Sequence, residues 1–133
     1  MKVNNLIALM AVVVIVQMVL IIGEILPPLA VNSSGNLLFD FAKTAIIAYT
    51  GWAFSKSGLK EATTKGVVVT LAGVLITFVA VLIGVVAHRP VLGMVLPSGI
   101  YFVLNLLVIG IANIIFGAIV AVIGTLAGRK VKK

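Results

Sequence analysis

Four long apolar runs constrain the fold of this chain more than any other feature of its sequence. They lie at about residues 6–27, 37–54, 66–87 and 98–127. Each approaches the ~20 residues that a helix needs to cross the hydrocarbon core of a bilayer. Only 10% of the side chains are charged, whereas about 25% is usual in soluble domains. The sequence therefore predicts an all-α, integral-membrane antiparallel four-helix bundle, formed by one domain over residues 1–133 with a short basic tail at 129–133.

The second run is the least secure of the four. Its uninterrupted apolar part covers only residues 45–54, which as a helix is ~15 Å long. A full crossing must therefore include residues 37–44, and these carry Asp40 and Lys43 into the membrane. The two side chains lie three residues apart, so on a helix they can form an ion pair.

Prolines set the expected boundaries of the other runs. The first run ends at Pro27-Pro28, because proline cannot continue a helix. From Val91 the chain stays apolar as far as Ala127, which is longer than a ~30 Å hydrocarbon core accommodates. We therefore predict a turn over 91–96, a break near Pro97 and a long last helix that is tilted or projects from the membrane.

The basic residues fall almost entirely on one side of this arrangement. One side receives eight of the 10 Lys and Arg residues, namely Lys2, Lys56, Lys60, Lys65, Arg129, Lys130, Lys132 and Lys133. The other side receives Arg89 alone, because Lys43 lies within the second run. Cytoplasmic loops carry such an excess, so both termini and the 55–65 loop are predicted to be cytoplasmic. We expect this basic face to contact lipid headgroups, or nucleic acid through non-specific phosphate contacts.

Small residues recur along the third and fourth runs at the spacing of a helix-packing seam. Close backbone approach, which small residues allow, is a main source of association between membrane helices. Each of these helices is therefore predicted to press against another helix, within one bundle or between subunits. The third run contributes Gly66, Thr70, Gly73, Thr77, Ala80 and Gly84, and the fourth contributes Gly110, Asn113, Gly117, Ala121 and Gly124.

Three charged residues form a candidate cluster at membrane depth. Glu24, Asp40 and Lys43 all lie toward the outer ends of their runs. An ionisable group at the bilayer centre costs ~2.5–3.5 kcal/mol on insertion scales, so we interpret the three as an ion cluster that fixes the first two helices. A proton or cation site is the functional alternative. The uncharged Gln17, Asn105 and Asn113 are expected to form hydrogen bonds between helices.

Little in the sequence supports catalysis. The chain has three carboxylates, one histidine and no cysteine, and none of them recurs at the spacing of a metal site or a catalytic dyad. The sequence also lacks a glycine-rich phosphate-binding motif. We therefore expect no enzymatic activity, no metal and no cofactor.

Three classes of function stay open on this basis. The first is a self-associating membrane protein with a structural role, as a homo-oligomer or a small subunit of a larger complex. The second is a capsid or envelope protein of a membrane-containing or spindle-shaped archaeal virus, with its basic face on the genome. The third is a small transporter, pore or holin-like protein. The four spans resemble those of the small multidrug resistance transporters. The first span of these transporters carries a glutamate deep within the membrane, whereas Glu24 lies at the outer end of its run. The basic tail resembles that of phage holins.

Overall fold

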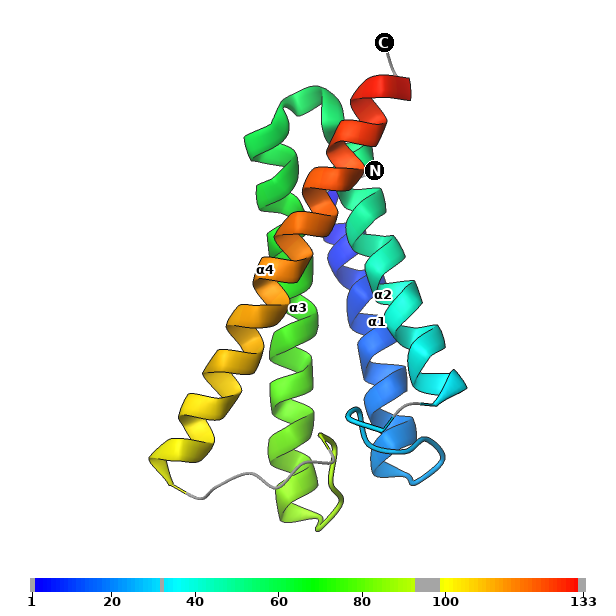
Figure 1. Ribbon diagram of the computed structural model, residues 1–133. Coiled ribbons are helices and arrows are strands. Elements are labelled where there is room, and N and C mark those ends of the chain that lie inside the picture. The colour runs from blue at the N-terminus through cyan, green and yellow to red at the C-terminus, as the bar shows by residue number, and fades with distance from the viewer. Residues whose placement is uncertain (1, 32, 93–98, 132–133) are drawn as a thin grey trace.

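The computed structural model describes residues 2–31, 33–92 and 99–131. Its four long helices are α1 (Val3–Ile22), α2 (Ser34–Ala53), α3 (Leu59–Val86) and α4 (Ile100–Val131), and the short 3-10 helix η1 (Ser55–Ser57) follows α2. The long helices run alternately in opposite directions, and the two chain ends lie toward the end at which α2 joins α3 (Figure 1). The predicted all-α four-helix bundle is confirmed.

Among the described residues, three helices are long and apolar enough to cross a membrane: α1, α3 and α4, whose most apolar 18-residue segments each have a mean hydropathy of 2.8. α2 is less apolar, because it carries Asp40 and Lys43. It is nevertheless as long as α1, with 20 residues, which corresponds to ~30 Å of helix. Length therefore permits α2 to cross a bilayer, provided that its polar side chains find partners inside the bundle.

The helix ends differ from the predicted boundaries for local reasons. α1 stops at Ile22, before the prolines, and the N–H of Gly23 bonds to the Val19 carbonyl at 2.9 Å. α2 begins at Ser34 because the Ser33 hydroxyl caps the helix, accepting a hydrogen bond from the Asn36 N–H at 3.1 Å. α3 begins at Leu59, seven residues before the apolar run. The predicted break at Pro97 lies outside the described residues.

We call the end of the bundle opposite the α2–α3 turn the outer end, and its two loops pair with each other. The N–H of Leu29, after α1, bonds to the Val91 carbonyl at 2.8 Å, and the N–H of Ala30 bonds to the Leu92 carbonyl at 2.9 Å. Val91 and Leu92 are buried. The part of the predicted 91–96 turn that the structure describes is therefore packed against the α1–α2 loop, and 93–96 lie outside the described residues.

The closest helix contact joins the C-terminal halves of α2 and α4. A Cβ atom at Gly51 would overlap the Ala121 carbonyl, and one at Gly124 would overlap the Ala48 carbonyl. Beyond this contact the two helices diverge toward the outer end of the bundle, with α3 beside α4 (Figure 1). The glycines therefore set the point from which α2 and α4 separate.

Candidate functional site

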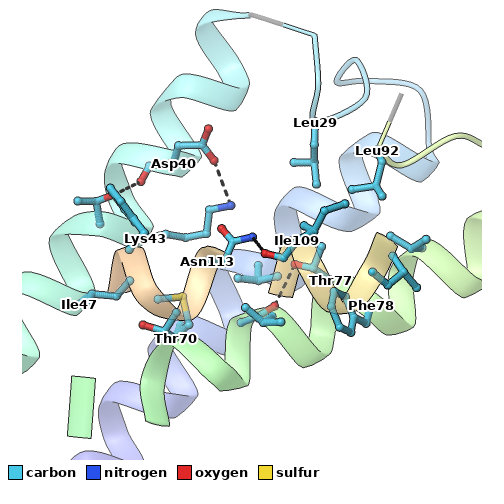
Figure 2. Close-up of a pocket in the computed structure, with 18 of the residues that line it drawn as sticks. Leu29, Asp40, Lys43, Ile47, Thr70, Thr77, Phe78, Leu92, Ile109 and Asn113 are labelled. Atoms are coloured by element: carbon cyan, nitrogen blue, oxygen red, sulfur yellow. Dashed lines mark hydrogen bonds and ion pairs between the residues drawn. The ribbon is translucent and has the colours of Figure 1, made fainter. Parts of the chain in front are cut away.

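A cavity of about 480 Å³ lies between the diverging halves of α2 and α4. All four long helices contribute to its walls, and Leu29 and Leu92 from the paired loops line it as well (Figure 2). Its volume is in the range of small-molecule sites, roughly 300–1,000 Å³. Most of the lining is apolar, with Asp40, Lys43 and Asn113 among its polar side chains.

The cavity exists because the outer half of α4 leans on α3 instead of α2. A Cβ atom at Gly110 would lie 2.8 Å from the Phe78 ring of α3, and Leu106, one turn away, is buried. The opposite wall consists of Asp40, Lys43, Thr44 and Ile47 of α2. Residues of α3 and α1 line the space between these two walls.

Lys43 is held by two polar partners on different helices. Its Nζ atom lies 3.1 Å from an Asp40 carboxylate oxygen and 2.9 Å from Oε1 of Gln17 in α1. Gln17 is completely buried, whereas the Asp40 side chain is 56% exposed and that of Lys43 is 22% exposed. The predicted ion pair of Asp40 and Lys43 therefore forms, and Gln17 extends it across the α1–α2 interface.

The network continues from Gln17 to Asn36 and the loop before α2. The Gln17 amide donates to Oδ1 of Asn36 at 3.2 Å. The Asn36 amide in turn donates to the carbonyls of Pro27 at 2.9 Å and Pro28 at 3.2 Å. Asn36 is buried, so this chain of hydrogen bonds anchors the loop to two helices. The sequence predicted that Gln17 forms a hydrogen bond between helices, which is confirmed, but it did not identify Asn36 as a partner.

Glu24 is not part of this network, which corrects the predicted three-residue cluster. Its carboxylate pairs with the Arg89 guanidinium, beyond the end of α3. The reason is that α1 ends at Ile22 and Glu24 adopts a positive φ of 62°. The residue has therefore left the helix before it could face Lys43.

Some donor and acceptor atoms in the walls of the cavity have no hydrogen-bond partner among the described residues. An ammonium group has three donors, and Lys43 uses two. The Asp40 carboxylate has one oxygen in the ion pair. Asn113 donates to the Ile109 carbonyl at 2.8 Å, which leaves its own carbonyl oxygen without a described hydrogen bond. The Lys43 and Asn113 side chains point toward the same part of the cavity from opposite walls (Figure 2).

The small residues predicted to form a seam on α3 pack against three different neighbours. Gly66 faces the Cβ of Ala121 in α4, and a Cβ at Gly73 would lie 3.3 Å from Met10 in α1. Gly84 packs under the backbone of Arg89. Ala80 is buried and Thr77 is half-buried beside the cavity.

The small residues predicted to form a seam on α4 also face different helices. Gly117 faces the Thr70 side chain of α3, whereas Gly124 faces α2. Asn113 is exposed, and its amide bonds to its own helix rather than to another one. Asn105 behaves in the same way, donating to the Tyr101 carbonyl at 2.7 Å. The hydrogen bonds between helices that we expected from these two asparagines are therefore not present among the described residues.

Comparison of the chain with known protein families, characterised proteins and solved structures finds no match. The described residues contain no group of three or more His, Cys, Asp or Glu side chains placed to hold a metal ion.

The charges of the described residues are segregated between the two ends of the bundle. Lys56, Lys60, Arg129 and Lys130 are exposed near the α2–α3 turn, where Gly128 packs against Ser55. Lys65 is half-buried, pairs with Glu61 at 3.1 Å and lies 4.0 Å from the centre of the Phe54 ring. At the outer end, Glu24 and Asp40 are balanced by Arg89 and Lys43. Lys132 and Lys133 of the predicted basic face lie outside the described residues.

Proposed function

We propose that this chain is a non-enzymatic structural membrane protein that associates with further copies of itself. In this proposal all four helices cross the bilayer, and the basic end, with both termini, lies on the cytoplasmic side. The observation that carries the proposal is a stripe of exposed residues on α4. These residues recur at the spacing of a heptad repeat, and one of them, Asn105, has an amide side chain. We call this stripe the outer stripe, and its members are Tyr101, Asn105, Val108, Ala112, Ile115 and Ile119.

The outer stripe has the pattern of a helix interface but faces no helix of its own bundle. Its members alternate at steps of four and three, which is the spacing of a coiled-coil seam. All six are exposed, with Tyr101 at 65% and Val108 at 66%. α4 is also the least covered of the three apolar helices, with 22% of its most apolar segment buried. This surface must therefore be covered by lipid or by protein.

Asn105 favours protein over lipid as the covering. Its amide nitrogen donates to Tyr101, and its carbonyl oxygen has no described hydrogen bond. Lipid tails cannot bond to an amide, whereas a second asparagine offers both a donor and an acceptor. When the same stripe of a second copy packs against it, the two Asn105 side chains can donate to and accept from each other. Ala112 is small enough to let the two backbones approach closely.

Self-association can be measured with two differently tagged copies that are reconstituted together in lipid vesicles and captured through one tag. We expect the wild-type copies to be captured together. Ala112→Phe, which blocks close approach, and Asn105→Leu, which removes the amide, should both reduce the capture. Ala127→Phe is the matched control, because Ala127 is exposed on α4 but outside the stripe. If the stripe variants are captured as well as the control variant, the outer stripe is not the interface.

A second candidate is supported by the segregation of charge. A bundle that is basic at one end only is suited to hold a polyanion there, as in a virion protein that lies between a membrane and a packaged genome. In that case the purified protein should bind DNA regardless of sequence, with an affinity that falls steeply as salt is raised. The double variant Lys56→Gln/Lys60→Gln should weaken this binding. Failure of the wild type to bind DNA at low salt would contradict this second candidate and leave the first intact.

A further inference from the structure

We propose that the cavity between α2 and α4 is a binding site for one membrane lipid. A single hydrocarbon chain of the lipid lies along the apolar lining, and oxygen atoms of its backbone or phosphate group contact Lys43. This site is separate from the outer stripe and does not depend on self-association. Three observations carry the proposal: the length of the cavity, its apolar lining and the unused hydrogen-bonding groups on its walls.

The length of the cavity matches one leaflet of a bilayer. On α3 its lining extends from Thr70 to Val81, which at 1.5 Å per residue is about 16 Å. On α4 it extends from Leu106 to Phe116, or about 15 Å. Half of a ~30 Å hydrocarbon core is about 15 Å. The lining also begins near the middle of α3 and ends toward its outer end, so it covers the depth of the outer leaflet in the proposed orientation.

The lining of the cavity suits a hydrocarbon chain, because most of it is apolar. Met10, Val14, Val74, Phe78 and Ile109 supply apolar contacts for such a chain.

The polar groups on the walls are complementary to the polar part of a lipid. Lys43 has one donor left for a phosphate or backbone oxygen, after its bonds to Asp40 and Gln17. The exposed Asp40 carboxylate can accept a hydrogen bond from an ammonium or hydroxyl headgroup. The free carbonyl of Asn113 faces the same space (Figure 2). In a membrane, polar groups without partners are costly, so a ligand that supplies both donors and acceptors stabilises this wall.

The proposal can be tested by filling the cavity with a larger side chain and measuring how much lipid remains bound. The protein is reconstituted in vesicles of phosphatidylethanolamine and phosphatidylglycerol that contain a trace of phospholipid spin-labelled on its acyl chain. Electron paramagnetic resonance then measures the motionally restricted label per protein. Val74→Phe places a ring in the cavity, whereas Leu75→Phe, its matched control, places the ring on the exposed side of α3, where Leu75 is 54% exposed. We expect Val74→Phe alone to lose one restricted lipid per protein, because the other lipids that contact the bundle surface are restricted equally in both variants.

Two results would overturn the proposal. The first is an equal amount of restricted label in Val74→Phe and Leu75→Phe. The second is a change of oligomeric state in Val74→Phe with the bound lipid unchanged, which would assign the cavity to a second copy. Helix content by circular dichroism checks that each variant folds. If Val74→Phe does not fold, Ile109→Phe, in the cavity, with Leu107→Phe, exposed on α4, repeats the comparison from the opposite wall.

Discussion

The Nζ atom of Lys43 in α2 lies 2.9 Å from the side-chain oxygen of Gln17 in α1, and Gln17 is completely buried. A lysine in the middle of a helix that crosses a bilayer would oppose membrane insertion if it faced lipid. Here the bundle supplies it with a carboxylate from one side and an amide from the other. This relationship explains how the least apolar of the four helices can be part of a bundle that is otherwise suited to a membrane.

Replacing Gln17 with Leu should destabilise the bundle markedly. The substitution removes one partner from Lys43 and one from Asn36, and a buried polar group that loses its partner costs about 1–3 kcal/mol. The free energy of unfolding can be measured by circular dichroism during titration with sodium dodecyl sulfate. Val16→Leu is the control, because Val16 is the neighbouring residue and is 44% exposed. An equal effect of the two substitutions would mean that the network adds nothing to stability.

The same substitution at two glycines should change the free energy of unfolding by different amounts. A Cβ atom at Gly124 overlaps the backbone carbonyl of Ala48, whereas one at Gly73 meets the flexible side chain of Met10 at 3.3 Å. Overpacking against rigid neighbours costs about 1–3 kcal/mol, so Gly124→Ala should lower the free energy of unfolding by at least that amount. Gly73→Ala should be close to neutral, because Met10 can move and alanine favours a helix by about 1 kcal/mol over glycine. The same detergent titration measures both variants, and equal losses would contradict this account of the α2–α4 contact.

The sequence was sufficient to predict the helices, their antiparallel order and the Asp40–Lys43 pair. Hydrophobic run length determines the first two, and the three-residue spacing determines the third. The spacing of small residues also showed that α3 and α4 are closely packed. It did not show which helix each small residue meets, because a helix in a bundle has neighbours on several sides. Gly51 of α2, which faces Ala121, belongs to no repeat and gave no signal.

The ion pairing of Glu24 and the cavity were beyond sequence reasoning for a different reason. The partner of Glu24 depends on where α1 ends, and that point is set by a left-handed backbone at Glu24 rather than by the prolines that follow. The cavity depends on the angle at which α4 leaves α2. That angle results from contacts at Gly110, Gly117 and Gly124 together, so no single segment of sequence encodes it.

Removing the Glu24–Arg89 ion pair should have only a small effect on stability. The side chains are 67% and 44% exposed, and exposed pairs contribute about 0–1 kcal/mol. Arg89→Gln should therefore change the free energy of unfolding by less than about 1 kcal/mol. Glu24→Gly should increase it despite losing the pair, because glycine adopts the positive φ of 62° without strain. A large loss in Arg89→Gln, or destabilisation by Glu24→Gly, would show that the pair holds the outer loops together.

The crossing of α2 can be tested directly, because the chain contains no cysteine. Ser34→Cys and Ser57→Cys place single thiols at exposed positions, at the first residue of α2 and in η1 just beyond its other end. If α2 crosses the bilayer with the basic end in the cytoplasm, a membrane-impermeant maleimide added to intact cells should label only Ser34→Cys. Ser57→Cys should react after the cells are permeabilised, which also controls for its reactivity. Labelling of both thiols from the same side would mean that α2 does not cross, and it would place the Asp40–Lys43 pair at the membrane surface rather than within the bilayer.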